Sequence, residues 1–122
     1  MTAEVEYVIA DPVVAGVAAR AALDTPGVVR LEPGLRGLVT AWTRTARGRW
    51  QGLDPAPIDG VRVRTSAGAL SVEVDVVTSA ADQAAAVGRA VQRAVTREVA
   101  AQTGLAVDAV LVSIVDIEWT RR

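Results

Sequence analysis

Valines that recur every four residues place the strongest constraint on how this chain can fold. The set consists of Val87, Val91, Val95 and Val99. Successive residues of an α-helix are about 100° apart, so this spacing gathers the valines on one side of a helix. A second set recurs at the same spacing on the opposite side: Arg89, Arg93 and Arg97. We therefore expect an amphipathic helix, about residues 80–103, with valines packed on a sheet and arginines facing solvent.

An alternating pattern ahead of this helix predicts a β-hairpin. Valines alternate with arginines over residues 61–64 and with acidic residues over 72–76. Ser66, Ala67 and Gly68 supply the turn between the two strands. One face of the hairpin is therefore apolar, while the other carries two arginines and two acids. We expect cross-strand ion pairs on that solvated face, among Arg62, Arg64, Glu73 and Asp75.

The first half of the chain predicts a second helix between two short strands, residues 4–9 and 28–32. Asp11 is expected to cap the helix, Pro12 fits its first turn, and Pro26 with Gly27 end it. One helical face collects the residues expected to be buried, which are Val13, Val14, Val17 and Ala21.

The C-terminal run AVLVSIVDIEW, residues 109–119, is apolar on both faces over its central part, which is typical of an interior strand. The expected fold is α+β, a small mixed β-sheet with two α-helices on one face. Its elements follow the order β-α-β-(insert)-β-β-α-β.

Composition excludes several kinds of chemistry. The chain of 122 residues is taken as a single domain, 1–122, and it contains no Cys, His or Lys. Thiolate nucleophiles, imidazole bases and Schiff-base lysines are therefore absent, and we expect no catalytic residues, no cofactor and no metal. The net charge of −1 makes nucleic acid an unlikely partner. The apolar run AVLVSIV is far shorter than the roughly twenty residues of a membrane span, so no direct membrane insertion is expected.

The insert, about residues 34–57, is the most informative stretch for partner binding. No acid lies between Glu32 and Asp54, and the span combines tryptophan with arginine, as protein hot spots do. The candidate partner-binding residues are Arg36, Trp42, Arg44, Arg47, Arg49 and Trp50. In the competing interpretation the tryptophans cover the core and the arginines are merely solvated. The helix arginines 89, 93 and 97 are a secondary candidate, because a charged helix face is most often only a solvated surface.

Several motifs resemble the alkaline shock protein family, also called envelope stress response proteins. They are P-G-V-V-x-L at 26–31, G-V-R-V-R at 60–64, V-E-V-D-V-V at 72–77, A-V-Q-R-A-V-T-R-E-V at 90–99 and T-G-L-x-V at 103–107. The resemblance covers about residues 5–119. It implies a small bacterial cytoplasmic protein, linked to cell-envelope homeostasis and stress, that self-assembles and is held near the membrane by a small membrane protein. No catalytic residue of the family carries over.

Together these observations predict a non-catalytic cytoplasmic scaffold that associates with itself, as a homo-oligomer, and with a small membrane-anchored protein. The alternative is a nucleic-acid-binding module that uses the basic insert and the arginine face of the long helix. RNA retention that depends on salt would distinguish the alternative from the scaffold.

Overall fold

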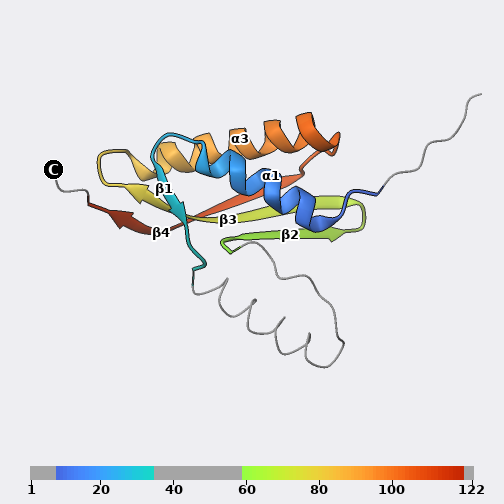
Figure 1. The fold of residues 1–122 in the computed structure, drawn as a ribbon, viewed down its shortest axis with the longest axis horizontal. Coiled ribbons are helices and arrows are strands. Elements are labelled where there is room, and N and C mark those ends of the chain that lie inside the picture. The colour runs from blue at the N-terminus through green and yellow to red at the C-terminus, as the bar shows by residue number, and fades with distance from the viewer. Residues whose placement is uncertain (1–7, 35–58, 120–122) are drawn as a thin grey trace, which may run out of the picture.

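The computed structural model describes residues 8–34 and 59–119 (Figure 1). The elements, labelled as in Figure 1, are α1 (Asp11–Leu23), β1 (Val28–Leu31), β2 (Val61–Ser66), β3 (Ala69–Ser79), α3 (Ala84–Thr103) and β4 (Ala109–Glu118). The predicted α+β class and the order of these elements are confirmed. The strand predicted at 4–9 falls mostly outside the described residues, and its last two residues, Val8 and Ile9, are not in a strand.

Strand β3 is the centre of the sheet. It pairs in antiparallel fashion with β2 over its first half and with β1 over its second half. Strand β4 pairs with β3 in parallel over residues 71–79 of β3, which is nearly its whole length. Strands β1 and β2 therefore share one side of β3, and β4 occupies the other side. The sheet is mixed, as predicted.

The predicted β2–β3 hairpin closes through a tight turn. Ala67 and Gly68 have φ angles of 50° and 80°. Two consecutive residues with positive φ give the turn geometry whose twist matches that of the flanking strands. The turn sets the register in which Arg62 lies opposite Glu73 and Arg64 lies opposite Ser71.

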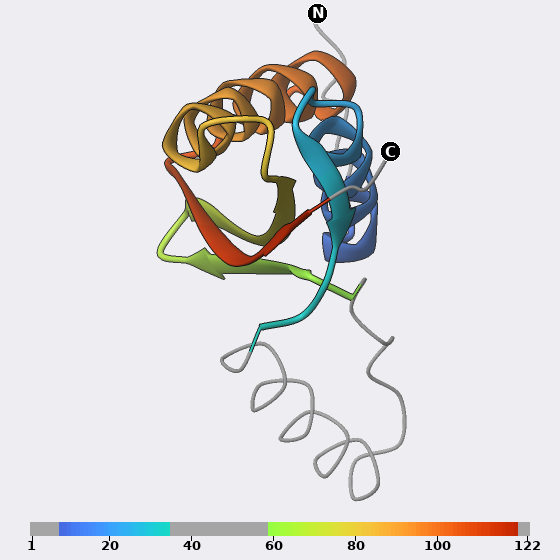
Figure 2. The ribbon, with the colours of Figure 1, turned by 90° about the vertical axis from the view of Figure 1, so that its left-hand side faces the viewer.

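Both helices cover the same face of the sheet and pack against each other (Figure 2). Helix α1 contacts β1, β2 and β3, and α3 contacts β3 and β4. All four valines of α3 are buried, and they meet the buried, inward-facing valines of β3 in one core. The β3 residues are Val72, Val74 and Val76. The amphipathic character predicted for α3 is thus confirmed.

Helix boundaries differ from the sequence-based expectation by one to four residues. Asp11 is the first helical residue of α1, and the capping position is Ala10, without a side-chain cap. Helix α3 begins at Ala84 instead of about residue 80, because Ser79 stabilises a turn by accepting a hydrogen bond from the Ala81 N–H at 3.2 Å. Gly104 ends α3 with φ of 76°, as expected for a glycine stop.

The buried face of α1 is also rotated from the one predicted. Val13 is 51% exposed, whereas the core side consists mainly of alanines. The buried residues of α1 are Val14, Ala15, Ala18, Ala19, Ala21 and Ala22. These small side chains allow α1 to pack closely against α3 and the sheet.

The prediction that the C-terminal strand is interior is wrong. Strand β4 lies at the edge of the sheet, and in the described part of the chain only β3 pairs with it. Side chains on β4 that would be covered in an interior strand are exposed, including Leu111 and Ile117, each at 45%.

Candidate functional site

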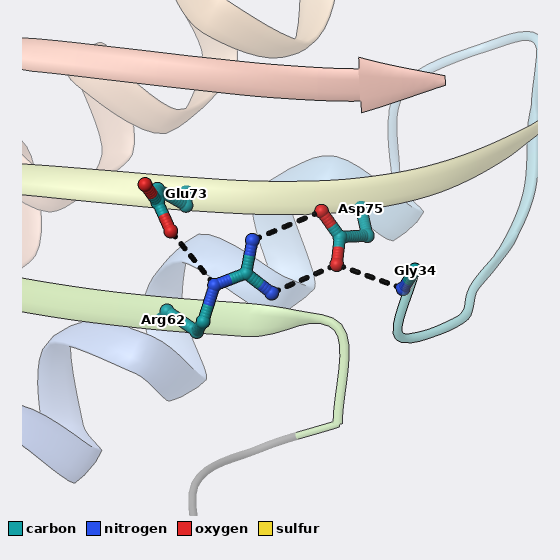
Figure 3. Close-up of polar contacts among 4 residues, drawn as sticks. All are labelled: Gly34, Arg62, Glu73 and Asp75. Atoms are coloured by element: carbon teal, nitrogen blue, oxygen red, sulfur yellow. Dashed lines mark hydrogen bonds and ion pairs between the residues drawn. The ribbon is translucent and has the colours of Figure 1, made fainter. Parts of the chain in front are cut away.

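A buried ionic cluster lies on the sheet face opposite the helices (Figure 3). Side chains alternate between the two faces of a strand, so Glu73 and Asp75 point away from the valine core. From β2, Arg62 reaches between them: its Nε donates to Glu73 Oε2 at 2.7 Å. Its Nη1 and Nη2 donate to Asp75 Oδ2 at 2.8 Å and Oδ1 at 3.2 Å. Arg62 is only 5% exposed and Asp75 only 2%, so this face is not solvated there, contrary to expectation.

Asp75 also attaches both ends of the chain segment that contains the predicted insert. On the entering side, the Gly34 N–H donates to Asp75 Oδ2 at 3.0 Å, and the Glu32 N–H donates to the Asp75 carbonyl at 3.2 Å. On the leaving side, the Asp75 N–H donates to the Gly60 carbonyl at 2.8 Å. One residue of the central strand therefore fixes where the Arg- and Trp-rich segment leaves the sheet and where it returns.

Gly60 is required at this attachment point. Its φ is 84°, and an added Cβ would lie 3.1 Å from Leu31 Cβ and 3.2 Å from the Glu32 nitrogen. A side chain would therefore be both conformationally strained and crowded by the entering segment.

The hydrogen bonds that Arg62 donates to Asp75 raise the pKa of Arg62 above its usual value, and the bond to Glu73 adds to this effect. Because the folded-state pKa of Arg62 is higher than its unfolded-state pKa, the charged form of Arg62 stabilises the fold. This contribution is complete at any pH below the unfolded-state pKa. That contribution is lost only as the pH rises through the higher folded-state pKa. Arg62 therefore remains charged in neutral and mildly alkaline conditions, and the cluster is no pH switch there.

The secondary candidate residues on α3 divide between two surfaces. Arg93 and Arg97 line a groove between α1 and α3, with a volume of about 420 Å³, whereas Arg89 is not among its lining residues. Arg20 of α1 contributes a third guanidinium to the groove. The apolar part of the lining is made of small side chains: Val17, Ala21, Pro26, Ala90 and Ala94.

Two carboxylates partly neutralise this groove. Arg20 pairs with Asp24 and Arg97 pairs with Glu98, each at 3.4 Å between exposed side chains. Such exposed pairs are worth at most about 1 kcal/mol, so a ligand carboxylate can compete for the arginines. Within the described residues, Arg93 has no ion-pair partner.

The leading candidate residues lie outside the described residues: Arg36, Trp42, Arg44, Arg47, Arg49 and Trp50. Sequence reasoning missed the roles of Asp75 and Arg20. The hairpin register did indicate a charge pair for Asp75, but its bonds to Gly34 and Gly60 depend on how distant segments meet. No sequence pattern singled out Arg20, because its position in the groove depends on which face of α1 packs against the core.

Two further observations concern residues 8–34 and 59–119 alone. No group of three or more acidic side chains there could hold a metal ion. No helix among them combines the length and apolar character needed to cross a membrane.

The chain forms a small α+β domain. Asp75 fixes both attachment points of a segment rich in Arg and Trp, and arginines line a groove between α1 and α3. A family model matches residues 1–119; it represents the alkaline shock protein 23 family, described as having a cell envelope-related function. The chain belongs to this family, which confirms the resemblance seen in its motifs.

Comparison with solved structures finds two MamM variants. A variant of MamM-CTD is 12% identical, with a TM-score of 0.48, covering 92% of this chain and 100% of that chain. A variant of MamM is 13% identical, with a TM-score of 0.44, covering 88% of this chain and 83% of that chain. No functional conclusion follows from similarity this low. A search of curated proteins finds no significant match.

Proposed function

We propose that this protein is a non-catalytic scaffold of the cell envelope that associates with itself and with a small membrane-anchored protein. The segment of residues 34–57 supplies the main contact with the membrane-anchored partner. The observation that supports this role is the attachment of both ends of the segment at Asp75. A fixed base limits how far the segment can move, which lowers the entropy lost when its tryptophans and arginines engage a partner.

The chemistry of the ionic cluster supports a positioning role over a purely stabilising one. Taking two charges out of water costs free energy that their attraction often only offsets, so a buried ion pair is weak evidence of stability. Here the pair holds Asp75 where its carboxylate also accepts the Gly34 N–H. The cluster thus specifies where the segment starts.

The groove between α1 and α3 is proposed as a second contact, for an acidic stretch of the partner. Three arginines beside a floor of small side chains suit a carboxylate-bearing peptide. Arg20 and Arg97 are each paired with a carboxylate, so the groove lacks the run of unpaired positive charge on which binding of a phosphate backbone depends. This favours a protein partner over the nucleic-acid alternative.

Recovery in the membrane fraction tests the proposed partner binding. Replacing both tryptophans, Trp42→Ala with Trp50→Ala, should lower recovery of the protein at least several-fold. Removing two of the three groove arginines, Arg93→Gln with Arg97→Gln, should lower recovery less, because charge without an aromatic anchor gives screened, weakly specific attraction. Each variant must first match the wild-type thermal midpoint. If the folded tryptophan variant is recovered normally and the arginine variant is lost, the groove is the main contact.

A further inference from the structure

The open side of β4 is a regular strand edge without a partner in the described part of the chain. Residues 109–114 pair in unbroken parallel register with residues 71–76 of β3. The register shifts only afterwards, between Val76 and Val77 on β3. On the outer side of 109–114, the Gln92 side chain of α3 donates a hydrogen bond to the Val110 carbonyl at 3.1 Å. Pairing with another strand therefore has to displace this one side-chain contact.

Apolar side chains gather on this strand. The exposed large hydrophobic residues of the described chain number eight, and four of them lie on β4 or directly after it. These four are Leu111, Ile114, Ile117 and Trp119. Leu111 shares the sheet face of the ionic cluster, whereas Ile114 faces the α3 side, where its Cδ1 lies 3.9 Å from the position of a Cβ on Gly88. Both faces of the strand therefore have apolar surface left to bury.

The β2 and β4 edges of the sheet differ in how they are protected. Strand β2 carries Arg62 and Arg64, followed by Thr65 and Ser66. Charged and polar residues of this kind keep natural edge strands from pairing with other chains. Residues 109–115 carry no charge, and the first acid, Asp116, comes after the register shift. The β4 edge thus lacks this protection over its regular part.

We propose that β4 pairs in antiparallel orientation with β4 of a second copy, joining two sheets into one. This inference rests on the self-association in the proposed function and names the surface that carries it. A second copy suits the edge because residues 109–114 are uncharged, so self-pairing places no like charges opposite each other within that stretch. Pairing also makes β4 of each copy an interior strand of the joined sheet, which suits its apolar sequence.

Strand geometry restricts where the twofold axis can lie. Directly opposite residues of an antiparallel pair point to the same face, and faces alternate along each strand. The twofold axis must therefore lie at the level of one residue, so that this residue is directly opposite its own copy in the second chain. For pairing centred on 109–114, that residue is Leu111 or Val112.

A charge placed on the edge tests the interface. Leu111→Lys introduces a charge at a side chain that is already 45% exposed, so the monomer should stay folded. Val13→Lys on α1, where the valine is 51% exposed, is the matched control. Sedimentation velocity should show a dimer for wild type and the control, and at least tenfold weaker dimerisation for Leu111→Lys. Equal dimerisation of all three proteins would overturn the proposed surface.

Cysteine cross-linking tests the geometry independently, because the chain contains no Cys. Directly opposite residues have Cα atoms about 4.5–5.5 Å apart, within the range that a disulfide spans. Either Leu111→Cys or Val112→Cys should therefore form a disulfide-linked dimer under mild oxidation, while Val13→Cys should not.

The possible outcomes separate this inference from the proposed function. A wild-type protein that is monomeric at every concentration contradicts self-association itself, and with it this interface. A wild-type dimer that survives Leu111→Lys and gives no cross-link at either position leaves self-association intact but places it on another surface.

Discussion

At the scale of single residues, Asp75 joins three separate stretches of the chain: the end of β1, the start of β2 and its own strand β3. Its side chain receives hydrogen bonds from Arg62 of β2 and from the Gly34 N–H, and its main chain bonds to Glu32 and Gly60. The carboxylate is almost fully buried, so its charge depends on the guanidinium of Arg62 for compensation. Removing Arg62 leaves Asp75 buried without its cation, whereas removing Asp75 leaves Arg62 with Glu73 as its one carboxylate partner in the cluster.

Single and paired substitutions should therefore behave differently. Asp75→Leu alone should lower the free energy of unfolding by about 3 kcal/mol, because the buried Arg62 loses its bidentate partner and keeps only its bond to Glu73. Arg62→Met combined with Asp75→Leu should cost less, since two apolar side chains then fill the space and the one charge left is Glu73, the most exposed member of the cluster. Urea denaturation of the two variants and the wild type measures this difference. A double variant as unstable as the single one would show that the ion pair itself stabilises the fold.

At the scale of elements, periodic patterns were reliable guides. The valines of α3 and the alternation in β2 and β3 predicted both elements, because a repeat of this kind directly reports which side chains share a face. The position of β4 could not be predicted, because an apolar strand sequence is compatible both with an interior position and with an unpaired edge of the sheet. The buried face of α1 was missed for a related reason: its alanines could fill more than one face.

Helix α3 provides a direct test of its two faces. Val95 is fully buried, so Val95→Ala should lower the free energy of unfolding by about 1–3 kcal/mol through lost burial and a cavity. Arg93 is exposed, so Arg93→Ala should change it by less than about 0.5 kcal/mol. Urea melts of the two variants measure the difference. Similar losses would mean that the arginine face is packed.

At the scale of the whole molecule, the sheet separates three surfaces with different chemistry. The helices form one side, with the arginine-lined groove between them. The opposite sheet face holds the ionic cluster at the base of the Arg- and Trp-rich segment. The β4 edge lies apart from the β2 edge, on the other side of β3. In the proposed account, self-association uses the β4 edge and the partner-binding segment starts from the opposite sheet face at Asp75.

The central claim is that an envelope partner is recognised by the segment that Asp75 holds in place. Its most direct test is co-sedimentation of purified protein with native membranes, comparing wild type with the Arg62→Met, Asp75→Leu double variant. The variant keeps Trp42, Trp50 and every arginine of the segment, but it loses the Gly34–Asp75 hydrogen bond. We predict saturable binding of the wild type to the membranes. The double variant should bind at least several-fold more weakly, although its thermal midpoint is unchanged. Equal binding of the two folded proteins would contradict the claim.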